Sequence, residues 1–369
     1  MFYPAETGGV GTYLRAKSRW LKSHGGIRHT VVAPSAGRHP DPDVVGIPSL
    51  PIPYSKGFLW PVSPALTTRC LQRLQPQLIE VGDPYQFAWS ALRAREKLNI
   101  AALAFYHSDL PQLASQRFGK AAQQAANLYV GRLYRQFDLV LAPSKVMVKK
   151  LRALGVTKAE HQPLGVDTAI FSPVRRNALL RQRLGLNANT RLLVYAGRFT
   201  REKNLSLLVK AVEELGAPYH LLLIGSDTLP YQSTYVSCLP FQSDAIALAE
   251  LLASCDLFVH PGHHETFGLV VLEALACGLP ALGTTGGGVA ELIDSDTGLL
   301  VRPGSSTAIV QGIRRLFRAD LRTMGATGRK KMLAQYDWNR IMPELMTHYA
   351  RLINNQQALT VPTDRLGLL

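Results

Sequence analysis

Cysteine is scarce in this chain, and the few cysteines present are not spaced like a metal or redox motif. The 369 residues contain only four, which lie far apart with no CxxC pair: Cys70, Cys238, Cys255 and Cys277. This spacing excludes a zinc ribbon and a thioredoxin-type redox site. It also makes structural disulfides unexpected and is typical of a protein of the reducing cytosol.

Long hydrophobic runs are also missing. No stretch reaches the roughly 18 uncharged apolar residues of a membrane-spanning helix, and the start MFYPAETGGVG lacks the basic segment and apolar core of a signal peptide. With 47% hydrophobic and 18% charged residues, the composition is that of a globular protein. At about 100 to 200 residues per domain, the length predicts two domains.

Acidic residues are few relative to basic ones. The chain has 41 Lys and Arg against 26 Asp and Glu, a formal net charge of +15. Residues 1–172 hold 21 of the basic and 10 of the acidic residues, so this half carries most of the excess. Such a balance suggests a nucleic acid, an anionic lipid or a phosphorylated small molecule as partner.

The hydrophobic periodicity alternates between strand and helix through both halves of the chain. In the first half we expect strands at Thr30–Ala33, Leu78–Val81, Ile100–Tyr106 and Leu139–Ala142, with helices at Val10–Ser23, Gln86–Lys97 and Lys145–Leu154. A second series runs from a strand at Arg191–Gly197 to a helix at Val289–Ile293. The alternation predicts an α/β protein of two doubly wound, Rossmann-like domains, joined by a linker around PLGVDTAIFSP.

A glycine-rich turn opens the first helix. Gly8, Gly9 and Gly11 would let the backbone approach a ligand closely, and Gly286–Gly288 offers a similar loop in the second half. Such a turn normally follows a buried strand, but only Met1–Tyr3 precede it here. We therefore expect the first strand to be absent or the start shortened, which leaves an exposed edge in the N-terminal sheet.

Open parallel sheets bind ligands at the carboxyl ends of their strands, so the segments that follow strands are the candidate sites. The first is GRFTREKN, in which Arg198, Arg201 and Lys203 stand beside the start of a helix that Asn204 is placed to cap. Cations beside a helix N-terminus suit an anion, although an ordinary solvated loop has the same composition.

The second candidate is HPGHHETFGLVVLE. Glu265 lies in the turn after a strand and Glu273 lies two helical turns further on, so both carboxylates can reach one cleft. Phe267 and Leu269 are expected to pack, and the N–H groups of Gly268–Val270 suit a phosphate. The three histidines of this segment raise the question of zinc, but no cysteine is near and we expect no metal.

The third candidate is FYHSDLP, directly after a strand. His107 followed by Asp109 could serve as an acid/base element or a sugar contact. The alternative is a capped turn, in which Ser108 or Asp109 satisfies backbone donors.

In this order and spacing, the segments resemble the large retaining glycosyltransferase family numbered four. The likeness rests on GGVGTYL, YHSDLP, LAPSKVMVKKL, PLGVDTAIFSP, YAGRFTREKNLSLLVKA, HETFGLVVLEALACGLPAL, GGGVAEL and YDWNRI, and it includes the E-x7-E pair Glu265 and Glu273. It implies the GT-B fold, two Rossmann-like domains facing across a cleft. The expected boundaries are 1–172 for the acceptor side, 173–336 for the donor side, 337–355 for a helix crossing back, and 356–369 for a tail.

The resemblance also implies roles for the candidate residues. Arg198 and Lys203 would neutralise the donor diphosphate together with the N–H groups at Gly268, Leu269 and Val270, beside Phe267. Glu273 would hold the ribose and Glu265 the transferred sugar. His107 would contact the sugar, and Gly8 and Gly9 would close over the phosphates and acceptor. No cofactor is implied, because the donor, GDP-mannose or a UDP-sugar, is a substrate. The motifs are most similar to those of mannosyltransferases that act on lipid acceptors.

Two basic clusters suggest where the acceptor is met. Arg15, Arg19 and Lys22 share a face of the first helix, and the second cluster is Lys145, Lys149, Lys150 and Arg152. Basic faces are attracted to anionic membranes by about 1 kcal/mol per Lys or Arg near the surface. We therefore expect a cytoplasmic enzyme that docks on the inner membrane face and glycosylates a lipid or glycan hydroxyl. The alternative interpretation is that these charges only keep the protein in solution.

Two other functions stay open. A GT-B-fold sugar-nucleotide epimerase would share the fold, but the E-x7-E pair argues against it. A nucleic-acid-binding protein is suggested by the net charge alone, and the chain has no recognised module and no basic residues interleaved with surface aromatics. We therefore expect no nucleic-acid partner.

Overall fold

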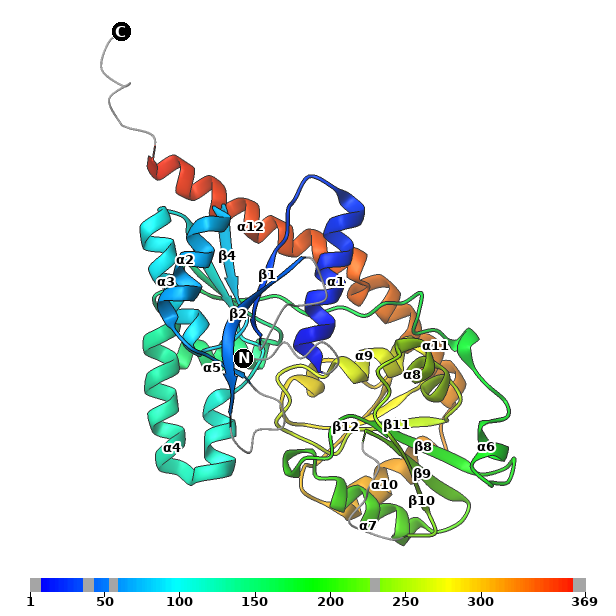
Figure 1. Ribbon diagram of the computed structural model, residues 1–369. Coiled ribbons are helices and arrows are strands. Elements are labelled where there is room, and N and C mark those ends of the chain that lie inside the picture. Colours follow the sequence, from blue (N-terminus) through cyan, green and yellow to red (C-terminus); the bar gives the residue numbers. More distant parts are fainter. Residues whose placement is uncertain (1–7, 36–42, 53–58, 226–232, 361–369) are drawn as a thin grey trace. The chain divides into compact units, whose positions relative to one another are not determined.

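The computed structural model describes residues 8–35, 43–52, 59–225 and 233–360, which form two compact units (Figure 1). Unit 1 comprises Met1–Gln162 and Met342–Leu369, and unit 2 comprises Pro163–Ile341. Unit 2 thus begins at the start of the expected linker, before residue 173, and the chain returns to unit 1 after residue 341.

Unit 2 contains a six-stranded parallel sheet in the order β10-β9-β8-β11-β12-β13. The strands are β8 (Arg191–Ala196), β9 (Tyr219–Ile224), β10 (Val236–Leu239), β11 (Leu257–Val259), β12 (Ala281–Thr284) and β13 (Gly298–Val301). The helices are α6 (Leu180–Arg183), α7 (Leu205–Leu215), α8 (Ala245–Ala253), α9 (Leu269–Ala276), α10 (Ser306–Leu316) and α11 (Leu321–Lys331). Figure 1 shows α8 and α9 on one side of the sheet and α7 and α10 on the other.

The central strands of unit 2 explain why the strand pattern is readable in the sequence. All six residues of β9 (YHLLLI) are buried, as are the last five of β8 (RLLVYA). Parallel strands covered by helices on both faces read as continuous apolar runs. The expected helix at Val289–Ile293 is only a short 3-10 turn, Gly288–Glu291.

The described residues of unit 1 form two sheets. The four-stranded parallel sheet has the order β4-β5-β6-β7, with β4 (Leu78–Val81), β5 (Ala101–Phe105), β6 (Leu139–Ala142) and β7 (Ala159–His161). The second sheet joins β1 (Val31–Ser35), β2 (Val44–Pro51) and β3 (Leu59–Pro61). The helices are α1 (Gly9–His24), α2 (Pro64–Leu74), α3 (Gln86–Leu98), α4 (Leu110–Tyr134), α5 (Lys145–Ala153) and part of α12 (Trp338–Thr360).

Strands β2 and β3 are absent from the sequence expectation because prolines interrupt them. Pro48 and Pro51 lie within β2, and Pro61 ends β3, so the segment reads as a proline-rich loop. Proline cannot donate a ladder hydrogen bond, but its carbonyl still accepts one, as Pro48 does from Val62 N at 3.0 Å. The question of a strand before Gly8 falls on residues 1–7, which lie outside the described residues.

A buried polar cluster ties three elements of unit 1 together. Glu80 of β4 accepts hydrogen bonds from Tyr13 and Lys17 of α1 and from Tyr349 of α12, with Lys17 Nζ 2.8 Å from Glu80 Oε1. The Lys17 side chain is 3% exposed. Burial alone raises the pKa of Glu80, but the Lys17 charge and these hydrogen bonds hold it below its usual value. The carboxylate therefore stays ionised and fixes α1 and α12 to the sheet.

The expected α/β fold class with parallel sheets is confirmed. No helix of the described residues is long and apolar enough to cross a membrane.

Candidate active site

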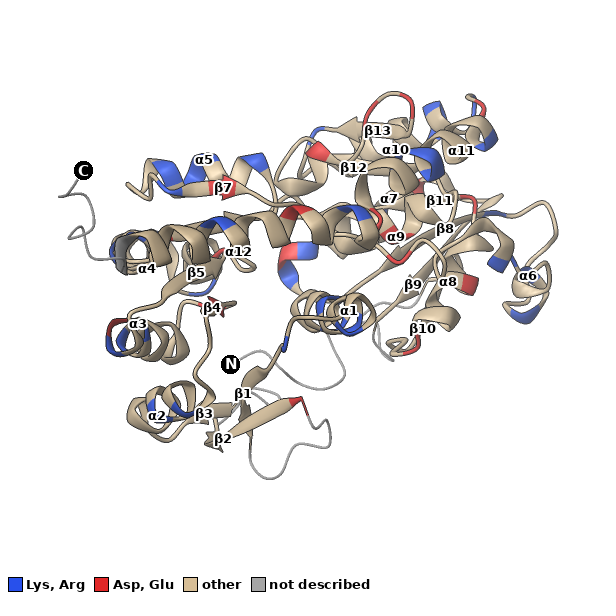
Figure 2. Ribbon diagram, turned by 90° about the horizontal axis from the view of Figure 1, so that it is seen from above, with Lys and Arg blue, Asp and Glu red and all other residues tan. Residues whose placement is uncertain are grey.

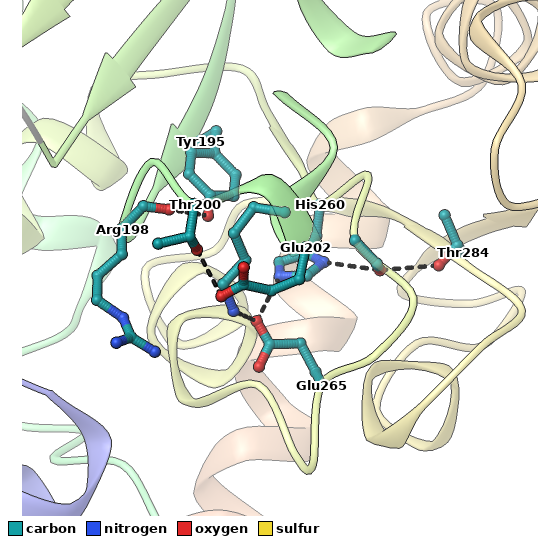
Figure 3. A network of polar contacts seen from close by, with 9 residues as sticks. Tyr195, Arg198, Thr200, Glu202, His260, Glu265 and Thr284 are labelled. Atoms are coloured by element: carbon teal, nitrogen blue, oxygen red, sulfur yellow. Dashed lines mark hydrogen bonds and ion pairs between the residues drawn. The ribbon is translucent and has the colours of Figure 1, made fainter. Parts of the chain in front are cut away.

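Two loops that follow neighbouring strands of unit 2 meet through an ion pair. Lys203 lies at the end of the 3-10 turn Arg201–Lys203 after β8, and Glu265 lies in the loop between β11 and α9. Lys203 Nζ pairs with Glu265 Oε1 (Figure 3). His260, just after β11, adds its Nε2 at 3.1 Å from the same oxygen. Strands β8 and β11 are adjacent and parallel. Both loops therefore lie at the same edge of the sheet, the one at which the carboxyl ends of its strands meet.

The electrostatics of this pair keep Glu265 charged. Burial alone raises the pKa of Glu265, but the Lys203 ammonium and the His260 hydrogen bond lower it far more, so the pKa lies well below its usual range. Glu265 is therefore a carboxylate at neutral pH. His260 is a partner that the sequence analysis missed as a site residue; its position directly after a strand, five residues before Glu265, is the signal that could have indicated it.

The glycine-rich loop at 286–288 packs against the backbone of the Glu265 loop. Gly288 N donates to Glu265 O at 2.7 Å, and a Cβ on Gly288 would lie 2.4 Å from Thr266 O. On the other side, Thr284 donates its hydroxyl to Gly262 O at 2.9 Å. In unit 2 this loop therefore contacts the protein backbone at Glu265 and Thr266, which is the close approach that its glycines permit.

Asn204 occupies the N-cap position of α7, but its side chain does not cap the helix. Its backbone is left-handed, with φ 53°, and no cap hydrogen bond forms. The Asn204 Nδ2 instead lies 3.1 Å from His263 Nδ1. The expected cap is thus wrong, because the left-handed backbone turns this amide toward the Glu265 loop.

The start of α9 offers free backbone donors. Gly268, the N-cap, has φ +108°, and a Cβ there would lie 2.9 Å from Val289 Cγ2, so glycine is required. The N–H groups of Gly268, Leu269 and Val270 make no hydrogen bond to any described residue. Leu269 and Val270 are half-buried, while the Phe267 side chain is buried and packs. This helix end can hold an anion.

Glu273 lies one to two turns into α9 and has no partner in the part of the chain that the structure describes. Its neighbours Val271, Leu272, Ala274 and Leu275 are fully buried. Burial raises the pKa of Glu273 to about 7. A carboxyl held in apolar surroundings without a hydrogen bond is unfavourable for stability, which is typical of a group that waits for a ligand.

Arg198 is exposed at the end of β8. Its carbonyl accepts from Tyr195 at 3.3 Å, but its guanidinium has no partner among the described residues, and Figure 3 shows it apart from the Lys203–Glu265 pair. Arg198 is thus available to an anionic ligand at the edge where Lys203, Glu265 and the start of α9 also lie.

Unit 1 carries the other expected residues. His107 stacks on Phe105, with ring centroids 4.3 Å apart, and lies 5.0 Å from the ring of Tyr13. Burial lowers the pKa of His107 to about 4, so the imidazole is neutral at pH 7. Gly8 is the N-cap of α1 with φ 107°, and Gly9 is the first residue of that helix.

Asp109 has the structural role that the sequence left as the alternative. Its Oδ1 accepts from Gln112 N at 3.3 Å and from Tyr106 at 3.1 Å, and Lys150 Nζ lies 2.7 Å away. Asp109 therefore caps α4 and is neutralised by Lys150. His107 and Asp109 do not form an acid/base pair in the described structure.

The described residues include no group of three or more His, Cys, Asp or Glu side chains arranged to hold a metal ion.

Comparisons with known proteins agree with this architecture. The family described as "Glycosyl transferases group 1" matches residues 177–331, and "Glycosyltransferase Family 4" matches residues 7–170. A GDP-mannose-dependent alpha-mannosyltransferase of Mycobacterium tuberculosis is 30% identical over 285 residues, 76% of this chain and 74% of the relative. The chain belongs to the family 4 glycosyltransferases. It is therefore a hexosyltransferase. These comparisons favour neither the epimerase nor the nucleic-acid-binding alternative.

Two further comparisons extend the assignment. A GDP-mannose-dependent alpha-(1-6)-phosphatidylinositol dimannoside mannosyltransferase of Mycobacterium tuberculosis is 32% identical over 264 residues, 69% of this chain and 68% of the relative. Among solved structures, sucrose-phosphate synthase from Thermosynechococcus elongatus has a TM-score of 0.77 at 24% identity, covering 95% of this chain and 94% of that one. The expected GT-B fold is confirmed.

The unpartnered carboxyl of this glycosyltransferase leads to a stability prediction. The pKa of Glu273 rises from 4.5 to about 7 on folding, so its burial is tolerated best when it is protonated, and stability is lost as pH rises from 4.5 through 7. We expect Glu273→Gln, which removes the ionisation, to raise the melting temperature at pH 8 relative to the wild type and to change it little at pH 5.

Thermal unfolding from pH 5 to pH 8.5 measures this difference. The matched control is Glu214→Gln, an exposed glutamate of α7, which should leave the melting temperature unchanged across the range. If the stability of Glu273→Gln and that of the wild type fall equally between pH 5 and pH 7, Glu273 is not the titrating group.

Proposed function

We propose that this glycosyltransferase is a retaining enzyme that moves a hexose, with mannose favoured, from a nucleotide-sugar donor to a hydroxyl of a lipid or glycan. The observation that carries the proposal is the grouping at one sheet edge of unit 2: the unpartnered Arg198 guanidinium, the unbonded N–H groups at the start of α9, and the unpartnered Glu273 carboxyl. A guanidinium and a set of backbone N–H donors suit a diphosphate, and a carboxyl suits the hydroxyls of a ribose.

The groups divide between the parts of the donor. Arg198, Lys203 and the α9 N–H groups would meet the diphosphate, because they offer positive charge and backbone donors. Glu273, once ionised, would accept hydrogen bonds from the ribose hydroxyls, and Glu265 would accept them from the transferred sugar. The Lys203–Glu265 pair is compatible with this division, since an ammonium has three protons and can contact a carboxylate and a phosphate together.

The transfer step needs charge stabilisation more than a protein nucleophile. The bond between the sugar's anomeric carbon and the diphosphate oxygen breaks, and the electron pair leaves with the nucleoside diphosphate. The acceptor oxygen bonds to the same carbon from the same face, and a departing phosphate oxygen takes the acceptor proton. Arg198 and Lys203 would stabilise the charge that grows on the diphosphate, and the site positions the two substrates.

His107 would contact the transferred sugar from unit 1, and Gly8 and Gly9 would approach the phosphates and acceptor. A neutral imidazole has one ring nitrogen that donates and one that accepts, which suits sugar hydroxyls. With a pKa near 4, His107 does not hold a proton to give at neutral pH. Its proposed role is therefore binding.

The donor and acceptor are proposed from the relatives. Both Mycobacterium tuberculosis relatives are named for GDP-mannose, and one is named for a phosphatidylinositol dimannoside. We take GDP-mannose as the favoured donor, a UDP-sugar as the alternative, and a lipid-linked hydroxyl as the favoured acceptor. The excess of basic residues in residues 1–172 supports an anionic membrane surface on the cytoplasmic side as the place where such a lipid is met.

Removing the free guanidinium tests the donor site. We expect Arg198→Ala to lower kcat/KM for the nucleotide sugar by about a hundredfold, about 3 kcal/mol, because it removes a charge that meets the leaving diphosphate. Initial-rate kinetics provide the measurement. The melting temperature without ligand should be unchanged, since the side chain is exposed and unpartnered.

The control for that variant is Arg318→Ala, another exposed arginine of unit 2 without a side-chain partner in the described structure. It should retain wild-type kinetics. Near-normal turnover by Arg198→Ala would remove Arg198 from the donor site.

The stereochemistry of the product tests the mechanism. We expect the anomeric configuration of the donor to be kept in the product, and we expect activity to survive EDTA because Arg198 and Lys203 supply the positive charge. Proton NMR of the anomeric signal during turnover, with and without EDTA, is the measurement. An inverted product, or activity abolished by EDTA and restored by Mg²⁺ or Mn²⁺, contradicts the proposed mechanism.

A further inference from the structure

The imidazole ring of His107 in unit 1 is contacted on more than one side. The Phe105 ring is stacked on it, with an angle of 2° between the ring planes and centroids 4.3 Å apart. The Tyr13 ring of α1 lies against both members of this stack, 5.0 Å from the His107 ring and 5.1 Å from the Phe105 ring. Directly after β4, a Cβ on Gly82 would lie 3.4 Å from His107 Cδ2. These contacts restrict how the His107 ring can turn.

The Tyr13 ring is itself fixed through its hydroxyl. Tyr13 is fully buried, and its hydroxyl donates to Glu80 Oε1 at 3.0 Å. A buried hydroxyl without an acceptor is unfavourable, so the ring is held where the hydroxyl reaches this carboxylate. Glu80 also accepts from Lys17, one turn further along α1, and from Tyr349 of α12. We call Tyr13, Lys17, Glu80 and Tyr349 the Glu80 network.

Lys17 differs from the other Lys and Arg residues of α1. Figure 2 shows Lys and Arg along this helix, and the other three are exposed, whereas Lys17 is buried. The Lys17 Nζ donates to Glu80 Oε1 at 2.8 Å and to the Tyr349 hydroxyl at 3.3 Å. It also lies 4.8 Å from the centre of the Tyr13 ring. The buried ammonium is thus surrounded by two hydrogen-bond acceptors and an aromatic ring.

Stability alone does not explain a buried charged network. Replacing a buried ion pair with packed apolar residues of similar volume is often neutral or stabilising, because the pair must offset the desolvation of both charges. What Lys17 and Glu80 provide instead is a defined geometry, since their hydrogen bonds are satisfied in one arrangement of the side chains. The ring whose position this arrangement fixes is that of Tyr13, which touches His107.

The network acts on His107 by position more than by charge. Burial lowers the pKa of His107 to about 4, the Glu80 charge raises it and the Lys17 charge lowers it. Because the two charges are paired at 2.8 Å, their effects on the imidazole oppose each other. His107 is neutral at pH 7, so the contribution of the network to His107 is geometric.

We propose that the Glu80 network is a positioning device for the transfer reaction, in which Tyr13, held by Glu80, sets the orientation in which the His107 imidazole meets the transferred sugar. The proposal rests on the proposed function, which gives His107 its contact with that sugar. The χ2 torsion of histidine has broad, roughly two-fold wells, so the backbone alone does not fix the ring. A ring that is ordered before the sugar binds loses less entropy on binding, and a misplaced contact lowers the rate.

A double-mutant cycle on kcat/KM tests whether Tyr13 acts through His107. Tyr13→Phe keeps the ring but removes the hydroxyl that Glu80 holds, and we expect it to lower kcat/KM for the nucleotide sugar about tenfold. His107→Ala should lower kcat/KM at least as much, and Tyr13→Phe added to His107→Ala should cause no further loss. Wild-type kcat/KM in Tyr13→Phe, or losses that multiply in the double variant, would overturn the proposal.

The matched control is Tyr219→Phe, which removes another tyrosine hydroxyl bonded to a charged side chain. Tyr219 is buried at the start of β9 in unit 2, and its hydroxyl accepts from Arg191 at 2.7 Å. This variant should keep wild-type kinetics. Tyr13→Phe should also keep the wild-type Kd for the free nucleoside diphosphate, GDP or UDP to match the donor, because that ligand has no sugar for His107 to contact. Isothermal titration calorimetry measures this Kd, and weaker binding by Tyr13→Phe contradicts a role confined to the sugar.

The motion of the His107 ring provides a readout that does not depend on activity. In protein with 13C-labelled histidine, the Cε1–Hε1 signal of His107 is identified by its loss in His107→Ala. Its relaxation should show greater ring motion in Tyr13→Phe and in Lys17→Met combined with Glu80→Gln, a pair of changes that leaves no unpaired buried charge. Tyr219→Phe should leave it unchanged. Wild-type ring motion in both network variants would overturn the proposal.

The two readouts separate this proposal from the proposed function. If the ring motion of His107 rises in the network variants but the wild type transfers no hexose from any nucleotide sugar, the network positions His107 and the proposed function fails. If transfer depends on His107 but the ring motion is the same in the wild type and both network variants, the proposed function stands and the positioning role fails.

Discussion

The Lys203–Glu265 ion pair is the contact on which the arrangement of the candidate site depends. It joins the loops that follow β8 and β11, which are adjacent parallel strands. His260 Nε2 contacts the same carboxylate oxygen. A partly buried ion pair is tolerated only when its remaining bonding positions are satisfied, because desolvation otherwise outweighs attraction. Here the Gly286–Gly288 loop supports the Glu265 backbone and Thr284 fixes the Gly262 carbonyl, so the pair is held by its surroundings.

Beside this satisfied pair, the same sheet edge keeps three groups unsatisfied. Arg198 has a free guanidinium, the first N–H groups of α9 lack acceptors, and Glu273 is desolvated without a donor among the described residues. Of the three, the desolvated Glu273 carboxyl lowers stability in the absence of ligand, and such trade-offs are concentrated at functional sites. The paired residues thus fix the geometry of the site. The unpaired groups can still form hydrogen bonds or ion pairs with a ligand that has both phosphate and hydroxyl groups.

Local patterns predicted the elements and loops, because buried parallel strands and amphipathic helices have clear periods. They predicted neither the partners nor the exceptions. Lys203 and Glu265 are 62 residues apart, and Tyr349 and Glu80 are 269 apart, distances at which periodicity carries no information. Asn204 shows the same limit at short range, because it adopts a left-handed backbone and contacts a histidine. The Asp109 cap was one of the two interpretations that the sequence left open, but its pairing with Lys150, 41 residues away, was not predicted. The prolines in β2 and β3 made these strands look like a loop in the sequence. The division of unit 1 into two sheets depends on which strands pair, and local sequence patterns do not predict that.

The central claim is that the edge formed by β8, β11 and α9 binds a nucleotide sugar, and ligand-dependent thermal stability tests it most directly. A ligand at 100 times its dissociation constant stabilises a protein by about 2.7 kcal/mol, which for a domain of this size raises the melting temperature by about 5 to 10 °C. Measured over GDP-mannose and a panel of UDP- and ADP-sugars, the account predicts a saturable shift with at least one of them, strongly reduced in Arg198→Ala. A folded wild-type protein whose melting temperature no nucleotide sugar changes at millimolar concentration would contradict it.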